Sequence, residues 1–142
     1  MLPFALPEKL DRDLSPVQSY WDGLRRGGNE MPFWDDVKQP ALEGLGTGVL
    51  LIDVFAQPER FRFNFLSSAL NQGAAGALKG RFADEGTLPH PLEYLRAQCS
   101  ATVEARKPTY YRHDGTQGYA RLLLPMWGDG RISMLLGAIT QL

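Results

Sequence analysis

Cysteine and histidine are scarce in this sequence of 142 residues, which contains one cysteine and two histidines. The single cysteine, Cys99, cannot form an internal disulfide, and no cysteine and histidine grouping has the spacing of a zinc site. No signature of a nucleophile with its base is present, so we expect a protein that is not an enzyme. This cysteine content suits a reducing compartment, and we expect a cytoplasmic protein.

An excess of positive charge and a long apolar run are also missing. The formal net charge is −1 and the basic residues are scattered, which argues against binding to nucleic acid or to a charged membrane surface. The longest apolar runs, such as residues 122–127, are much shorter than a membrane span. Residues 1–13 lack the apolar region of a signal peptide. The composition, 44% hydrophobic and 22% charged, is that of one globular domain.

The N-terminal part of the sequence predicts a flexible leader followed by one helix. Residues 1–14 contain prolines and mixed charges, which favour irregular structure. Ser15 and Gln18 have the spacing of a capping box, so we assign a helix to residues 15–28 with Ser15 as its cap. Apolar and aromatic side chains recur on one face of this helix: Val17, Tyr20, Trp21 and Leu24.

A core domain is expected over residues 47–142, after an irregular linker over residues 29–46 that is rich in proline and glycine. Alternating or continuous apolar residues predict five strands, at 50–54, 60–65, 110–113, 119–127 and 131–140. In the second strand Phe61, Phe63 and Phe65 alternate with polar residues, so these three rings are expected on one face.

Helical structure is expected between the second and third strands. Residues 67–91 are rich in glycine and alanine, with Gly73 and Gly76 among the glycines, and this favours short helical turns joined by loops. The longest helix is predicted over residues 92–107, where Pro108 ends it. Its buried stripe consists of Leu92, Leu95, Cys99, Thr102 and Val103.

The last two strands carry apolar residues on both faces, so the sheet needs a cover on each side. The middle helices can cover one face. The N-terminal helix, a partner subunit or both must cover the other. The stripe of Trp21 is therefore either a cap over its own sheet or a dimer interface, and both alternatives stay open at this stage.

Three stretches of the sequence resemble a PAS domain of the short bacterial subgroup that occurs without an attached output domain. They are Tyr20-Trp21 with Met31-Pro32, Phe61-Arg62-Phe63 with Lys79-Gly80-Arg81, and Arg121-Leu122-Leu123-Leu124-Pro125-Met126 with Asp129-Gly130. The likeness covers residues 16–140, and it departs from the subgroup at Ser67-Ser68, where a glycine is usual. The resemblance implies an α+β fold with a five-stranded antiparallel sheet in order 2-1-5-4-3 and helices on one face.

The resemblance also implies signal transduction, commonly by a homodimer. We therefore expect a stand-alone sensory module that binds a small apolar or amphipathic ligand and signals through contact with another signalling protein. Tyr111 or Arg121 would supply a polar contact to that ligand. The expected pocket residues are Phe63, Phe65, Leu70, Phe82, Leu95, Cys99, Tyr111, Arg121 and Leu123. The expected dimer interface consists of Val17, Tyr20, Trp21 and Leu24.

Few residues of this sequence can hold a cofactor. His90 precedes a proline at a helix entrance and His113 lies beside a turn, so the sequence argues against haem, with His90 the preferred ligand if haem binds. Cys99 lacks the setting of a flavin-reactive cysteine and is expected to be a core side chain. Two alternatives remain: a ligand-free interaction or dimerisation module, and a small α+β enzyme that uses His90, His113 and Asp114.

Overall fold

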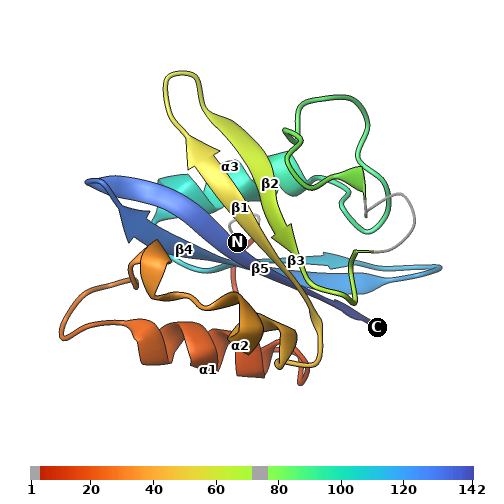
Figure 1. Cartoon of the computed structure of the whole chain (residues 1–142). Coiled ribbons are helices and arrows are strands. Elements are labelled where there is room, and N and C mark those ends of the chain that lie inside the picture. The colour runs from red at the N-terminus through yellow and green to blue at the C-terminus, as the bar shows by residue number, and fades with distance from the viewer. Residues whose placement is uncertain (1–3, 72–76) are drawn as a thin grey trace.

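The computed structural model describes residues 4–71 and 77–142 and contains one antiparallel sheet of five strands (Figure 1). The strand order is β2-β1-β5-β4-β3, which confirms the predicted order and the α+β class. The strands are β1 (Gly48–Phe55), β2 (Arg60–Leu66), β3 (Thr109–His113), β4 (Tyr119–Gly128) and β5 (Arg131–Gln141).

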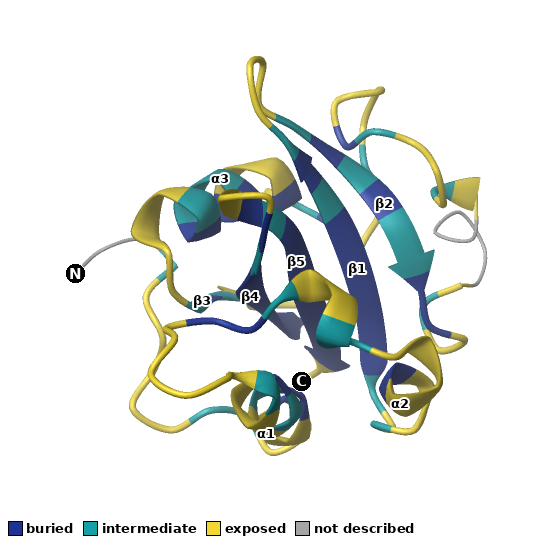
Figure 2. Ribbon diagram, turned by 60° about the vertical axis from the view of Figure 1, so that its left-hand side comes forward, coloured by how far each residue is buried: buried dark blue, intermediate teal, exposed yellow. Residues whose placement is uncertain are grey.

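Helices lie on both faces of this sheet. They are α1 (Ser15–Leu24), the 3₁₀ helix η1 (Trp34–Asp36), α2 (Gln39–Glu43) and α3 (Leu95–Ala105). Helices α1 and α2 lie on one face, called the outer face below, and α3 lies on the opposite, inner face (Figure 1 and Figure 2). Within residues 4–71 and 77–142, no helix is long and apolar enough to cross a membrane.

The two covers explain why β4 and β5 are apolar on both faces. Gly137 of β5 lies opposite Leu50 of β1 and Leu123 of β4. A Cβ atom added at Gly137 would lie 2.8 Å from a methyl carbon of Leu50 and 2.9 Å from one of Leu123. Glycine therefore allows these two leucines to approach each other across β5, which closes the core beneath α3.

Helix α1 is shorter than expected and is capped differently. It ends at Leu24, because Arg25 has an extended conformation. Leu14 is the N-cap residue and no side chain caps the helix, so the prediction of Ser15 as the cap is wrong. The amides of Leu14 and Ser15 both donate to the carbonyl oxygen of Asp11 (3.0 and 3.1 Å). A turn of the preceding backbone thus leads directly into the helix.

The segment 29–46, expected to be an irregular linker, contains two short helices and contributes to the core. Helix η1 has three residues and α2 has five. Met31 and Leu42 are 5% and 0% exposed. Helices this short leave little periodicity in a sequence, and their stability comes from tertiary contacts rather than from propensity.

Helix α3 also starts later than predicted, at Leu95 instead of residue 92. Tyr94 has a left-handed backbone conformation, with φ 58°, and this turn separates Leu92 from the helix. Residues 78–91, where short helical turns were expected, form turns and an isolated bridge between Phe82 and Arg62. Gly73 and Gly76 lie outside the described residues.

A β-bulge changes the face on which one predicted core ring lies. Phe61 and Phe63 are buried on the inner face, opposite Val54 and Ile52 of β1. The register shifts between Leu51 and Ile52, so Phe65 pairs with Leu51 and lies on the other face. Leu66 replaces it on the inner face and is 7% exposed. Strict alternation predicted Phe65 there, and the inserted residue overturns that prediction.

The N-terminal segment, expected to be a flexible leader, is hydrogen-bonded in residues 4–14 to the edge strand β3 and to the central strand β5. The amide of Tyr110 in β3 donates to the carbonyl oxygen of Phe4 (2.8 Å). The Tyr110 hydroxyl donates to Asp11 (2.6 Å), and the Thr140 hydroxyl in β5 donates to Asp13 (3.1 Å). These contacts place the start of α1 beside the C-terminal end of β5.

Candidate functional site

The side chains predicted to line a pocket do not all lie together. Phe63, Leu95, Cys99 and Leu123 meet on the inner face and are each at most 1% exposed. Arg121 and Tyr111 lie on the same face, because they are partners in the register of β3 and β4. Leu70 lies at one end of this face, where a Cβ atom added at Gly48 would be 2.7 Å from its side chain.

Phe82 belongs to a different cluster, at the β1–β2 hairpin. Its ring centre lies 5.5 Å from that of Phe55 and 3.7 Å from the guanidinium carbon of Arg60. Arg60 also forms a two-contact ion pair with Asp84, at 2.9 and 3.0 Å. Phe82 therefore does not contribute to the predicted pocket, and neither does Phe65, which strand alternation had placed there.

The space beneath α3 is occupied by the side chain of Arg121, which is 0% exposed. Its Nε donates to Gln98 (2.7 Å), and its two terminal nitrogens donate to the carbonyl oxygens of Pro91 (3.1 Å) and Glu93 (2.8 Å). Burial lowers the pKa of Arg121, because removing a charged guanidinium from water is costly. The hydrogen bonds and the ring of Tyr111, 5.0 Å from its guanidinium carbon, offset that cost.

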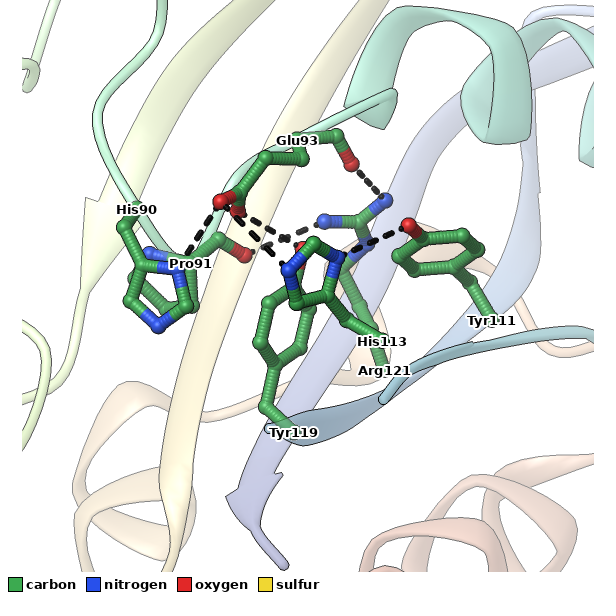
Figure 3. A network of polar contacts seen from close by, with 7 residues as sticks. All are labelled: His90, Pro91, Glu93, Tyr111, His113, Tyr119 and Arg121. Carbon is green, nitrogen blue, oxygen red and sulfur yellow. Dashed lines mark hydrogen bonds and ion pairs between the residues drawn. The ribbon is translucent and has the colours of Figure 1, made fainter. Parts of the chain in front are cut away.

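Figure 3 shows a polar cluster beside Arg121 with the carboxylate of Glu93 at its centre. Oε2 of Glu93 lies 2.8 Å from Nδ1 of His90 and 3.9 Å from Nε2 of His113, and Oε1 accepts a hydrogen bond from the Tyr119 hydroxyl (2.9 Å). Partial burial disfavours the ionised carboxylate, but hydrogen bonds from His90, the Glu93 amide and Tyr119 outweigh it and lower the pKa of Glu93 to about 2.

Strands β3 and β4 supply the aromatic part of this cluster. His113 pairs with Tyr119 in the register, and their rings stack with centres 5.0 Å apart and planes 13° from parallel. The Tyr111 hydroxyl lies 3.1 Å from Nδ1 of His113. Burial, and then the hydrogen bond to the carboxylate of Glu93, raise the pKa of Tyr119, so its hydroxyl remains a donor.

An open groove of about 640 Å³ lies next to the polar cluster, at the end of the sheet. We call it the sheet-end groove. Its lining residues are Asp13, Gly46, Thr47, Gly48, Ala69, Leu70, His90, Pro91, Gln117, Tyr119, Ile139, Thr140 and Gln141. Leu70 is the one member of the predicted pocket that lines it.

Sequence reasoning missed Glu93, Tyr119 and Gln98 as site residues. His90 and Glu93 are three residues apart, a spacing that can bring two side chains together, but their segment is not helical. A second signal was the alternation of Tyr111 with His113 and of Tyr119 with Arg121 on two neighbouring strands. That alternation places four polar or aromatic side chains on one face, provided that the two strands pair in the observed register.

The stripe on α1 covers its own sheet, which was the first of the two alternatives. Val17 and Trp21 are 0% and 4% exposed, and Nε1 of Trp21 donates to the carbonyl oxygen of Pro125 in β4 (2.8 Å). The Tyr20 hydroxyl accepts a hydrogen bond from the amide of Lys38 (3.1 Å), and Leu24 is half-buried. Val17 and Trp21 are thus already covered within the chain.

Among the residues considered for cofactors, the structure brings His90 and His113 together and leaves Cys99 apart. Burial raises the pKa of Cys99 to about 12, so its thiol is a protonated core group. Asp114 pairs with Arg112 (2.8 Å) instead of with a histidine. His90, Glu93 and His113 each offer one ligand atom within 4.8 Å of the others, a grouping compatible with a metal ion.

The fold and this cluster define an α+β protein with one five-stranded antiparallel sheet and a polar site at the open end of its inner face. No protein-family model matches the chain, and no curated protein matches it in sequence.

Proposed function

We propose that the protein is a PAS-like sensory module that binds a small amphipathic ligand in the sheet-end groove and signals by contact with another protein. One observation carries this proposal: segments from both layers of the fold line the groove. Asp13 precedes α1 on the outer face, Thr47 precedes β1, and His90 precedes α3 on the inner face. A ligand bound there touches the cover of each face of the sheet.

The groove suits an amphipathic molecule because its lining is mixed. Leu70 and Ile139 offer apolar surface, while Thr140, Gln117 and His90 offer hydrogen-bonding groups. The position differs from the one expected from the sequence, between the strands and α3, because Arg121 and the packed apolar side chains occupy that interior. The resemblance to PAS domains supports the sensory role, and the groove supplies the place for the ligand.

The contact between Asp13 and Thr140 provides a route from the groove to α1. Both residues line the groove, and the Thr140 hydroxyl donates to the Asp13 carboxylate (3.1 Å). Asp13 lies two residues before α1, and the side chain of Trp21 in α1 is hydrogen-bonded to β4. A ligand that competes for this hydrogen bond would favour a different position of α1, and a partner protein that contacts α1 would detect the change.

The rival function is a ligand-free interaction module, and the close packing beneath α3 is the observation that favours it. The inner-face side chains Phe63, Leu95 and Leu123 are at most 1% exposed. A fully packed interior needs no ligand for stability. The two functions differ in one measurable property, because a sensor retains or responds to a small molecule and an interaction module does not.

Native mass spectrometry of the purified protein, combined with thermal shifts across a metabolite panel in the presence of a chelator, tests the proposal. We expect the native chain to retain a small molecule or to show a shift in melting temperature with a specific metabolite. Ala69→Trp, which places an indole at an exposed position on the groove, is expected to abolish the effect.

Ala56→Trp is the matched control, because Ala56 is exposed in the β1–β2 turn, away from the groove residues. The control should bind as the native chain does. A ligand-free mass together with no shift across the panel would support the interaction module and contradict the sensor. An equal thermal shift in both variants would show that the ligand binds outside the groove.

A further inference from the structure

Three side chains of the polar cluster have the composition of a transition-metal site. His90 and Glu93 come from the loop before α3, and His113 comes from the end of β3. Their ligand atoms all lie within 4.8 Å of one another. Two imidazoles and one carboxylate are the donor set that zinc and its neighbours in the first transition series take in sites with an open coordination position.

The distances are close to those that such an ion needs. With metal–ligand bonds of about 2.0–2.2 Å, tetrahedral ligand atoms lie about 3.3–3.6 Å apart. Oε2 of Glu93 is 2.8 Å from Nδ1 of His90 and 3.9 Å from Nε2 of His113. When an ion binds, the His90 ring must therefore move slightly away from Oε2, and the His113 ring must move slightly closer to it. The side chains of His90 and His113 are 36% and 28% exposed, so both rings have some room for this adjustment.

Neighbouring side chains orient two of the three ligands. The Tyr111 hydroxyl lies 3.1 Å from Nδ1 of His113, so it can accept a hydrogen bond from Nδ1, and in that tautomer Nε2 is unprotonated and faces Glu93. The Tyr119 hydroxyl holds Oε1 of Glu93 (2.9 Å) and leaves Oε2 toward both imidazoles. The stacked ring of Tyr119 limits rotation of His113. Outer contacts of this kind are typical of histidine and carboxylate ligands in metal sites.

The nearby guanidinium of Arg121 does not pair with the negative charge of the site. Its hydrogen bonds go to the side chain of Gln98 and to the backbone carbonyls of Pro91 and Glu93, not to the Glu93 carboxylate. That carboxylate is therefore available to a second cation. A divalent ion, one carboxylate and one guanidinium leave a net positive charge, which favours water, hydroxide or an anion in the remaining coordination position.

We propose that His90, Glu93 and His113 bind one divalent transition-metal ion of the zinc type, with an open coordination position at the surface. His90 lines the sheet-end groove and also a second groove of about 630 Å³ that contains Gln117 and Gly118. Solvent or a small anion reaches the ion from either groove. The metal site goes beyond the sensory function proposed above, because the three ligands bind the ion whether or not an organic ligand occupies the groove.

Isothermal titration of the chelator-treated protein with zinc chloride tests the site. We expect one ion per chain, and a loss of affinity of at least about tenfold in His90→Ala, in His113→Ala and in Glu93→Gln. Asp114→Asn is the matched control: it neutralises an exposed carboxylate next to His113 that lies outside the ligand set. The control should bind zinc as the native chain does.

A second measurement on the native chain covers the case in which a variant fails to fold. The chain has two histidines, so ¹⁵N-imidazole NMR reports on both ligands, and both signals should shift on addition of zinc. Equal zinc affinity in the native chain and the folded histidine variants, or unchanged imidazole signals at saturating zinc, would overturn the proposal. The groove test above is made with a chelator present, so either proposal can fail without the other.

Discussion

Arg121 is a buried cation whose hydrogen bonds join three segments on the inner face. It joins β4 to Gln98 of α3 and to the backbone of the loop that carries His90 and Glu93. A buried arginine of this kind is costly to desolvate, and its value lies in fixing a polar geometry that apolar packing cannot fix. We therefore interpret Arg121 as the residue that positions the Glu93 loop, not as a ligand contact.

Replacing Arg121 with alanine is expected to lower the free energy of unfolding by about 2–4 kcal/mol, since it leaves a cavity and buried carbonyl oxygens without donors. Urea unfolding measures the change. Arg112→Ala, one strand away, removes an exposed ion pair with Asp114 and should cost less than about 1 kcal/mol. Equal losses in the two variants would contradict the assigned role of Arg121.

The low pKa of Glu93 predicts an acid dependence of stability in the metal-free protein. The pKa falls from 4.5 to about 2 on folding. The ionised carboxylate therefore stabilises the fold fully above pH 4.5, and this stabilisation is lost as the pH falls from there toward 2. Because the side chain is 31% exposed, solvent reduces the effect to about 1–2 kcal/mol.

Unfolding free energies measured from about pH 6 down to about pH 3 check this prediction. Glu93→Gln should be less stable than the native chain at the upper end and should lose less stability on acidification. The exposed variant Glu104→Gln serves as the control and should follow the native curve. A Glu93→Gln curve parallel to the native one would show that Glu93 does not cause the acid dependence.

At the scale of elements, α1 is stabilised through one aromatic side chain. The helix has ten residues, too few to be stable in isolation. Trp21 supplies both apolar burial and a hydrogen bond to Pro125 of β4 (2.8 Å). The outer face of the sheet and the helix therefore stabilise each other.

Trp21→Ala is expected to reduce the free energy of unfolding by about 3–5 kcal/mol, as for other large core truncations. Trp21→Phe keeps most of the apolar contact and removes the indole donor, so a smaller loss of about 1–2 kcal/mol is expected. Thermal unfolding monitored by circular dichroism separates the two. A folded Trp21→Ala variant of native stability, with a lower mass in light scattering, would instead place Trp21 at a dimer interface.

At the scale of the whole molecule, the N-terminal segment connects the edge strand β3 to the central strand β5. It meets β3 at Phe4 and Asp11 and the end of β5 at Asp13. The contact of Asp11 with Tyr110 joins residues 99 positions apart. Burial and then the hydrogen bond to Asp11 raise the pKa of Tyr110 to about 12, as expected of a donor held against a carboxylate.

Removing this contact tests whether the N-terminal segment is part of the folded unit. Tyr110→Phe should lower the free energy of unfolding by about 1.5–3 kcal/mol, the usual range for a hydrogen bond to a charged group. Tyr94→Phe is the control, because Tyr94 is 68% exposed. Unfolding by urea gives both values. If Tyr110→Phe is as stable as the native chain, residues 4–14 are not part of the folded unit and form the flexible leader expected from the sequence.

The apolar pattern of the sequence predicted the strands to within two residues at every end and the inward position of Cys99 and Leu123, because burial of a sheet on both sides produces a strong pattern. The strand order was implied by the family resemblance and not by this pattern. The sequence did not predict η1 and α2, which are too short to show periodicity. It placed Phe65 wrongly, because alternation carries no sign of a bulge. Of the candidate site it named His90, His113, Tyr111 and Arg121, but it did not group them with Glu93 and Tyr119.

The sequence by itself determined the sheet, since the spacing of apolar residues decides which segments can be buried between two layers. Tertiary structure alone decided the site. Glu93, His113 and Tyr119 are at most 26 positions apart in sequence, yet they meet because the β3–β4 register and a left-handed turn at Tyr94 direct them to one point. Polar contacts of this kind depend on distances of a few ångströms between segments, and no one-dimensional pattern encodes such distances.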